Sequence, residues 1–281
     1  MKVLAVLLVS LAFAGPAGLT PAQRGSEYIA ARQQPDGGFA EPGASSDPSL
    51  TAWAVLGLKA DGRNPASLRR GGASAADYLA DEPTRTTTDL ALRILALDAL
   101  GVDVAQLADR LAQERRADGR IGPLVNSTVW GVIALRAAGR PAPAASVRFL
   151  LRRQHRSGGW SWTPRGTPDS NDTAAAIQAL RTAGVRGAPI RRGLGYLRRA
   201  QNRDGGFALT AGVRSDAQST AWAIQAFVAA GVRPPVKAFR YLLSLRQPAG
   251  SFRSSRGREI TPVWVTATVL PALARQPFPL R

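Results

Sequence analysis

The acidic stretch Asp169-Ser170-Asn171-Asp172-Thr173-Ala174 holds the side chains of this chain that are best suited to chemistry. A carboxyl group can give or take a proton, so Asp169 or Asp172 could serve a lyase or hydrolase as acid or base. The same residue types also satisfy the free amides of a helix start, where the helix dipole favours carboxylates. We favour the helix cap and keep catalysis by Asp169 and Asp172 as the alternative.

The sequence offers no evident metal ligands. It contains no cysteine and one histidine, His155, so any metal would have to be bound by oxygen atoms alone. The carboxylates are not grouped for this purpose, since Asp36, Asp118 and Asp204 each precede a glycine and are typical of turns. We therefore expect neither a metal nor a cofactor.

Four tryptophans follow polar residues at the start of apolar segments, which makes them candidates for a binding site. Large aromatic side chains usually pack in a core, and we expect these to lie between two layers of helices. The alternative is that they line a cavity for an apolar or cationic guest, with three carboxylates at its rim. The tryptophans are Trp53, Trp130, Trp222 and Trp264, and the carboxylates are Asp47, Asp172 and Asp216.

A repeated motif indicates how these residues are positioned. It consists of an aromatic and an aliphatic residue, then Gln or Arg four residues later, then glycine, one residue, and an aromatic. Regular recurrence of this kind marks a repeat protein. The four copies begin at Tyr28, Phe149, Tyr196 and Tyr241, and their last aromatics are Phe39, Trp160, Phe207 and Phe252.

Each copy lies between two predicted helices. The segment before it is amphipathic, as Val147 to Gln154 shows, and predicts an outer helix that faces solvent. The segment that follows about a dozen residues later is apolar almost all round and predicts a buried inner helix. Outer helices are expected to start near Pro21, Pro65, Asp103, Ala142, Ala188 and Pro234, and inner helices near Asp47, Thr88, Ser127, Asn171, Gln218 and Pro262.

These elements make six helical hairpins of about 40 residues, which could form an open solenoid or a closed ring. The apolar inner helices favour closure. The second hairpin is degenerate, because Tyr78-Leu79 is followed by Asp81-Glu82-Pro83 without a glycine pair. The sequence leaves open whether the ring is sealed there, and whether Gln276 to Arg281 closes the ring or hangs free.

The motif resembles the glutamine-tryptophan repeat of squalene and terpene cyclases, which protein prenyltransferase β subunits share more loosely. The resemblance covers nearly the whole chain after residue 20 and implies an all-α fold, an α/α toroid with six inner and six outer helices around a funnel. It also implies that the motif glutamines cap the following inner helix, stack on their own aromatics and so join neighbouring hairpins. The structural motif residues are then Gln33, Phe39, Gln154, Trp160, Gln201 and Phe207.

The resemblance further implies that a cyclase would hold its proton donor at the second acid of an Asp-x-Asp-Asp-Thr-Ala motif. That position is Asn171 in this chain, and an amide has no acid form near neutral pH. A protein prenyltransferase needs a zinc site with a cysteine, which this chain lacks. The sequence therefore argues against the activity of a cyclase and against that of a protein prenyltransferase.

The amino terminus predicts export. Met1-Lys2 precedes an apolar run from Val3 to Ala14, and small residues occupy the positions that a signal peptidase recognises. We expect a signal peptide over residues 1–17, cleaved after Ala14 or Ala17, a single toroid domain over 18–281, a secreted or extracytoplasmic location and no transmembrane segment after cleavage.

The chain is strongly basic, with a formal charge of +18 and an isoelectric point near 11.6. Nearly all of the positive charge is arginine, and arginine pairs recur on the predicted outer helices. We expect a solvated outer face and no nucleic acid partner, with anionic lipid headgroups or cell-wall polymers as the alternative contact.

Our leading hypothesis is a non-catalytic toroid that binds an apolar or amphipathic, isoprenoid-like ligand in its centre. The first alternative is a reduced class II cyclase, or an unrelated enzyme, that uses Asp169 or Asp172. The second is a scaffold whose arginine-rich surface contacts a partner, which a centre filled by side chains would favour.

Overall fold

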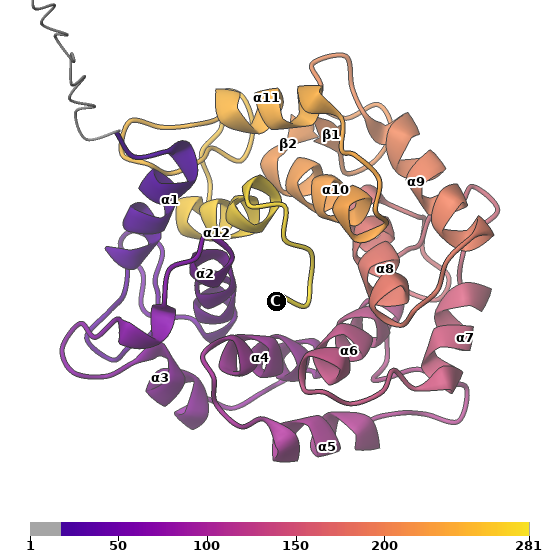
Figure 1. Cartoon of the computed structure of the whole chain (residues 1–281), viewed down its shortest axis with the longest axis horizontal. Helices are drawn as coiled ribbons and strands as arrows, with labels where there is room; N and C mark the ends of the chain where they lie inside the picture. The colour runs from indigo at the N-terminus through magenta and orange to yellow at the C-terminus, as the bar shows by residue number, and fades with distance from the viewer. Residues whose placement is uncertain (1–17, 281) are drawn as a thin grey trace, which may run out of the picture.

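A computed structural model describes residues 18–280, which form two concentric rings of helices (Figure 1). The outer ring contains α1 (Pro21–Ala30), α3 (Ala75–Asp81), α5 (Ala105–Gln113), α7 (Ala144–Arg152), α9 (Ala188–Ala200) and α11 (Val236–Ser244). The inner ring contains α2 (Pro48–Ala60), α4 (Thr87–Ala99), α6 (Val125–Ala137), α8 (Ser170–Thr182), α10 (Ala217–Ala229) and α12 (Pro262–Leu273). A 3₁₀ turn, Pro65–Ser67, and a two-stranded antiparallel hairpin, β1 (Phe207–Ala208) and β2 (Ser215–Asp216), complete the described elements.

The inner ring is closed. Each inner helix contacts the next, including α2 and α4 beside the degenerate hairpin, and α12 contacts α2. The all-α toroid predicted from the sequence is therefore confirmed. The predicted signal peptide lies outside the described residues. Within 18–280, no helix is both long enough and apolar enough to cross a membrane.

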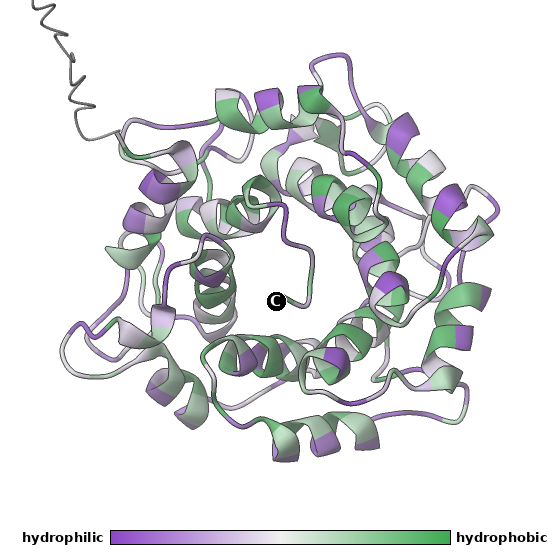
Figure 2. Cartoon of the chain, viewed as in Figure 1, coloured by the Kyte–Doolittle hydropathy of each residue, from purple (hydrophilic) through white to green (hydrophobic). Residues whose placement is uncertain are grey.

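Hydropathy explains the division into two rings. The inner helices are apolar on most faces, as α2 illustrates with ten buried residues among its thirteen (Figure 2). The outer helices bury one stripe only, and α9 buries Ile190, Leu194 and Leu197 while its arginine pairs point outward. A helix that is apolar all round must be covered on all sides, whereas an amphipathic helix suits the outside.

The second outer helix begins later than expected. We predicted its start near Pro65, but only a short turn forms there and α3 begins at Ala75. Gly71 and Gly72 lie between them with φ angles of 84° and 101°, a backbone region that an α-helix does not use. This correction leaves the second hairpin with a short outer helix of seven residues.

A threonine in the first turn of most inner helices ties the motif to its helix. The hydroxyl oxygen of Thr173 accepts a hydrogen bond from the backbone N–H of Trp160 at 2.9 Å. The same bond joins Thr51 to Phe39, Thr220 to Phe207 and Thr266 to Phe252, and Thr128 accepts from Ile121. Each bond satisfies a buried amide and fixes the last residue of the motif, aromatic in four of these five cases, against the start of its inner helix.

Two of the motif glutamines connect neighbouring hairpins, as the resemblance implied, but the glutamines do not cap the inner helices. Gln154 Nε2 donates to the carbonyl oxygens of Gly158 at 2.8 Å and of Pro189, in the next outer helix, at 2.9 Å. Gln33 does the same with Gly37 and Leu68, and Gln201 donates to Gly205. The expectation that they cap inner helices is wrong, because Asp47, Asp169 and Asp216 cap α2, α8 and α10 instead.

The first glycine of the motif allows the hairpins to approach each other. Gly158 has a φ angle of 91°, and a Cβ atom there would collide with the carbonyl oxygen of Arg192 in α9. Gly37 and Gly250 stand in the same relation to Ser74 and Arg24. Since Arg24 belongs to α1, the contact at Gly250 also closes the outer layer between the last and first hairpins.

A carboxylate closes the inner ring at the same junction. Glu41, in the loop before α2, accepts hydrogen bonds from the backbone N–H groups of Val263 and Trp264, both at 2.9 Å. These amides belong to the first turn of α12, which has no side-chain cap of its own. An anion at a helix start satisfies free amides and interacts favourably with the helix dipole.

Replacing Gly158 by alanine should lower the free energy of unfolding by at least about 2 kcal/mol, because the variant combines a left-handed backbone with a backbone collision. Gly195 is the matched control, since it lies inside α9 and a Cβ there meets only Arg199 Nη1 at 3.7 Å. Gly195→Ala should stabilise the protein by up to about 1 kcal/mol. Urea unfolding measures both, and equal effects would contradict the packing argument.

Replacing Glu41 by alanine should destabilise the toroid by about 1–3 kcal/mol, because two buried helix amides lose their shared acceptor. Glu259 is exposed and serves as the control, so Glu259→Ala should leave thermal unfolding nearly unchanged. An equal melting temperature for Glu41→Ala and the parent chain would show that the hydrogen bonds of Glu41 to α12 do not hold the ring closed.

Candidate functional site

Three tryptophans meet on the axis of the ring. Trp53, Trp130 and Trp222 occupy the same repeat position, two residues after the first-turn threonine, on alternate inner helices. Their ring centroids lie 5.4 to 6.0 Å apart, and they are between 3% and 7% exposed. The expectation that they pack between the two helical layers is wrong, because indoles from alternate helices reach across the centre and contact one another.

Trp264 does not join this layer. It precedes Thr266 by two residues instead of following it, and so occupies the repeat position of Ser49, Asn126, Asn171 and Gln218. It is half-buried and lines a pocket of about 180 Å³ with Asp216 and Gln218. Of the four predicted ligand-binding tryptophans, three therefore meet on the axis and the fourth, Trp264, lines a separate pocket.

The segment after α12 fills the centre of the ring on one side of the tryptophans (Figure 1). Phe278 is 3% exposed, and its ring lies 5.8 Å from that of Trp53 and 5.9 Å from that of Trp130. Both pairs are T-shaped, a favourable aromatic geometry. The segment thus neither closes the ring nor hangs free.

Two buried glutamines hold the backbone of that segment. Gln178 Oε1 accepts from the N–H of Phe278 at 2.9 Å, and Gln225 Nε2 donates to the carbonyl oxygen of Gln276 at 3.2 Å. Both lie five residues after the threonine of their helix, where α2, α4 and α6 carry Leu56, Leu95 and Ile133. At this level of the inner ring, polar side chains therefore come from the two adjacent helices α8 and α10 among the five compared.

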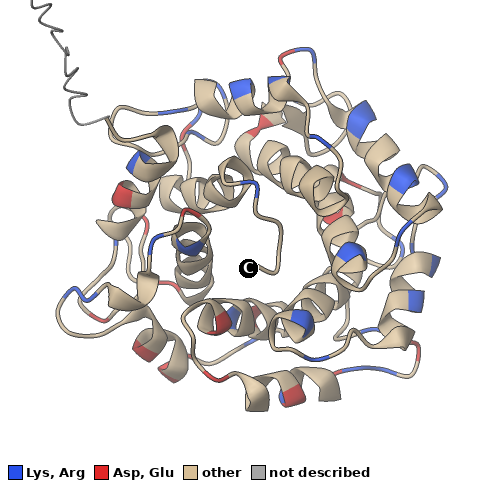
Figure 3. Ribbon diagram, viewed as in Figure 1, with Lys and Arg blue, Asp and Glu red and all other residues tan. Residues whose placement is uncertain are grey.

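A basic pocket of about 430 Å³ opens where the segment enters the ring. It is lined by Arg181, Arg186 and Arg275 together with Gln178 and residues 276–279, and no carboxylate lines it. Arg181 is held by the carbonyl oxygens of Ala229 and Val185, while Arg186 is exposed. Figure 3 shows basic residues at this mouth as well as on the outer helices, where the sequence predicted them.

The inner helices run in parallel, so the site has layers along the axis. The starts of α6 and α8 meet through Asn126 and Asp172, and the ends of α8, α10 and α12 meet at the basic pocket. The tryptophans lie between these two regions. The glutamines come three residues later along their helices than the tryptophans, which is about 4.5 Å further along the axis at 1.5 Å per residue. The carboxylate region and the Phe278 region therefore lie on opposite sides of the tryptophan layer.

Asp169 and Asp172 differ in their surroundings. Asp169 is the N-cap of α8 and accepts a hydrogen bond from the N–H of Asp172 at 2.8 Å. Asp172 is 4% exposed, and its Oδ1 accepts from Asn126 Nδ2 at 2.8 Å. Burial raises the pKa of Asp172 to about 8, the neighbouring charge of Asp169 adds to the rise, and the Asn126 bond opposes it. Asp172 can therefore carry a proton at neutral pH.

Asp47 and Asp216 line pockets in which Asp172 takes no part. Asp47 caps α2 by accepting from the N–H of Leu50 at 2.7 Å. Asp216 caps α10 by accepting from the N–H of Ser219 at 2.7 Å, and burial raises its pKa against the effect of this bond. They line two separate pockets, because each carboxylate stays at the start of its own helix.

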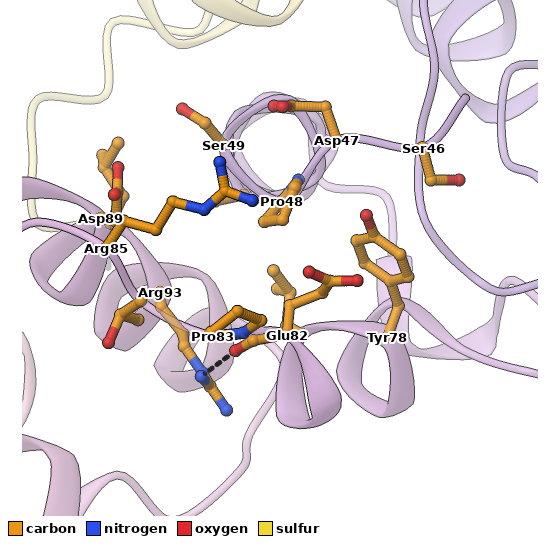
Figure 4. Close-up of a pocket in the computed structure, with 14 residues that line it drawn as sticks. Ser46, Asp47, Pro48, Ser49, Tyr78, Glu82, Pro83, Arg85, Asp89 and Arg93 are labelled. Carbon is orange, nitrogen blue, oxygen red and sulfur yellow. Dashed lines mark hydrogen bonds between the residues drawn. The ribbon is translucent and has the colours of Figure 1, made fainter. Parts of the chain in front are cut away.

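The degenerate second hairpin leaves a pocket of about 410 Å³ between α2, α3 and α4 (Figure 4). Tyr78 and Glu82 point toward the first turn of α2, and Arg85 reaches toward Pro48 and Ser49. Burial raises the pKa of Tyr78 to about 12, helped by the charges of Glu82, Asp36 and Asp47. The equivalent tyrosines, Tyr196 and Tyr241, donate to carbonyl oxygens at 2.6 Å. The pocket is lined by both acidic and basic side chains.

Three features of the site were missed from the sequence. Phe278 lies between two prolines beyond the last helix, a weak signal for burial. Gln178 and Gln225 could have been noticed as polar residues at one repeat position of apolar helices. Asn126 was assigned only to a helix start. Among residues 18–280, no three His, Asp or Glu side chains gather as a metal site.

Comparisons with known proteins agree with this architecture. No family model matches the chain. Drimenyl diphosphate synthase from Streptantibioticus cattleyicolor is 30% identical over 244 residues, which cover 70% of this chain and 46% of that protein. The chain thus spans about half the length of this relative.

Solved structures give the same result for the fold. A protein from Actinoplanes superposes with a TM-score of 0.69 at 19% identity, covering 91% of this chain and 98% of the other. The type II terpene cyclase MstE from Scytonema superposes with a TM-score of 0.69 at 15% identity, covering 90% and 96%. The chain therefore has the α/α toroid fold that terpene cyclases and protein prenyltransferases share.

Proposed function

We propose that the toroid binds an amphipathic, isoprenoid-like molecule on its axis without converting it. The observation that carries this proposal is the seating of Phe278 against Trp53 and Trp130, because it places an apolar group that belongs to no helix in an aromatic site. The apolar body of the ligand would occupy this half of the funnel. Its charged head would lie at the pocket of Arg181, Arg186 and Arg275.

The relatives supply the ligand class. MstE has been solved with its substrate geranylgeranyl dihydroxybenzoate, and drimenyl diphosphate synthase is named for a diphosphate. Arginine guanidinium groups suit both carboxylate and phosphate oxygens. We further propose that binding occurs outside the cytoplasm, on the strength of the apolar run from Val3 to Ala14.

We propose that the ligand is not converted, because the position at which a cyclase would hold its proton donor carries an amide. Asn171 stands where the resemblance implies the proton donor, and an amide cannot protonate an alkene. Asp172, the buried acid beside it, lies on the far side of the tryptophans from the basic pocket.

A matched pair of probes tests the proposal. Farnesyl diphosphate and farnesol share one chain and differ in the head, so the diphosphate should bind more tightly and quench tryptophan fluorescence. Arg186→Gln should weaken farnesyl diphosphate binding about 3- to 10-fold and leave farnesol binding unchanged, because one charge is removed from the mouth. The control is Arg148→Gln, on the outer face of α7. Failure of both probes to bind would favour the scaffold.

A reduced class II cyclase is the second candidate, and the buried carboxyl of Asp172 is the observation that favours it. A general acid must hold its proton at working pH, and burial gives Asp172 a pKa of about 8. Cyclic product formed from farnesyl diphosphate, and abolished by Asp172→Asn, would favour this candidate over the binder.

The protonation of Asp172 has a measurable consequence. Its pKa in the folded chain lies above that of an unfolded aspartate, so between about pH 4 and pH 8 only the folded state keeps the proton. The stability of the parent chain should therefore fall relative to Asp172→Asn by up to about 1.4 kcal/mol per pH unit, with no further loss above about pH 8. Urea unfolding at several pH values measures this, with the exposed Asp81→Asn as control. A constant difference between the two proteins would contradict a neutral Asp172.

A further inference from the structure

The segment after α12 turns back into the ring within a few residues. Arg275 has a φ angle of 55°, and the N–H of Gln276 donates to the carbonyl oxygen of Pro271 at 2.8 Å. This reversal turns residues 276–280 into the centre of the ring (Figure 1), where Phe278 contacts Trp53 and Trp130. The segment is therefore directed along the path that a ligand from the mouth would take.

The inner helices are adapted to a polar occupant at one depth. Gln178 and Gln225 are 1% and 0% exposed, and they face the segment from adjacent helices α8 and α10. With the segment in place both amides are buried, and each uses a hydrogen bond to the segment's backbone to offset the cost of that burial. The other inner helices carry Leu, Ile or Pro at this position, so α8 and α10 are the two that match an occupant with polar atoms.

The segment does not use all of the polar atoms in the glutamine and tryptophan layers. Within the described chain, Gln225 Oε1 and Trp222 Nε1 are buried and have no hydrogen-bond partner. The two groups lie one turn apart on α10 and offer one acceptor and one donor. An occupant with a hydroxyl or amide group there could satisfy atoms that residues 276–280 leave unpaired.

The segment is held by contacts at both of its ends. The N–H of Gln276 bonds to Pro271, the Phe278 side chain packs in the core against two indoles, and Gln178 and Gln225 bind the backbone. Gln276, Pro277, Pro279 and Leu280 are each only half-buried, and the basic pocket runs beside them. A ligand that replaces one apolar group and two hydrogen bonds could compete with it.

We propose that residues 276–280 are a displaceable internal occupant, which fills the ligand's place in the free protein and leaves when the ligand enters. The inference rests on the proposed function and narrows its ligand. The competing molecule carries an apolar group for the place of Phe278 and, beside it, a hydroxyl, carbonyl or amide group that pairs with Gln178 and Gln225. Its anionic end remains at the arginine mouth.

Hydrogen exchange of the full chain with and without farnesyl diphosphate tests the displacement. Pro277 and Pro279 have no amide hydrogen, so exchange in this segment reports Gln276, Phe278 and Leu280. Saturating probe should increase exchange of the peptide that contains them, because the Phe278 amide loses Gln178 as its acceptor. Binding that leaves this peptide equally protected, or better protected, would overturn the inference and leave the proposed function standing.

The variant Phe278→Ala provides a second test. It weakens the binding of residues 276–280 to the ring and leaves the inner helices unchanged. The state in which this segment has left the ring should become more populated, so farnesyl diphosphate should bind about tenfold or more tightly. The control is Val236→Ala, which truncates an exposed side chain on α11 and should leave the affinity unchanged. Equal affinity of Phe278→Ala and the parent chain would also overturn the inference.

The outcomes separate this inference from the proposed function. If neither the parent chain nor Phe278→Ala binds the probe, the proposed function fails and the segment is a permanent plug. If both bind and the segment stays protected, only the displacement fails. Should Phe278→Ala not fold, the exchange experiment on the parent chain still decides the question.

Discussion

A ring of six helices leaves a space on its axis, and the rest of this structure depends on how that space is filled. Side chains from alternate helices reach the axis, so Trp53, Trp130 and Trp222 meet there. The intervening helices carry Leu92, Ala175 and Thr268 at the same position, which leaves room for three indoles. Interiors of proteins are close-packed, and a layer of large and small residues in alternation satisfies that requirement. The tryptophans thus divide the funnel into two halves.

The ring itself is held by contacts between successive hairpins, each of which needs a close backbone approach. The motif glycines permit that approach, and Gln33 and Gln154 then reach backbone carbonyls of the next hairpin. At the junction of the last and first hairpins, Gly250 and Glu41 supply the equivalent contacts for the outer and inner rings. Closure is therefore a repetition of local contacts with one added carboxylate, which explains why the degenerate second hairpin does not open the ring.

The sequence predicts the helices and the toroid well because both follow from local periodicity and from a motif of fixed spacing. It places the start of α3 too early, since a proline suggested a helix start ahead of the glycine pair at 71–72. It misses the contacts that join distant residues, such as Glu41 with Trp264 and Phe278 with Gln178, which are 223 and 100 residues apart. Trp264 was grouped with the other tryptophans by its nearness to a helix start, whereas its offset from the threonine decides its place.

The two halves of the funnel suit different roles, and this distinction bears on function. The half at the helix starts holds a buried carboxyl beside Asn126 and Asn171, whose amide oxygens have no partner among the described residues. The half at the helix ends holds glutamines, Phe278 and an arginine mouth. A substrate head at the arginines and a proton at Asp172 would lie on opposite sides of three packed indoles. Catalysis by Asp172 would thus require the tryptophan layer to part, whereas binding beside Phe278 requires only that the chain's own segment move.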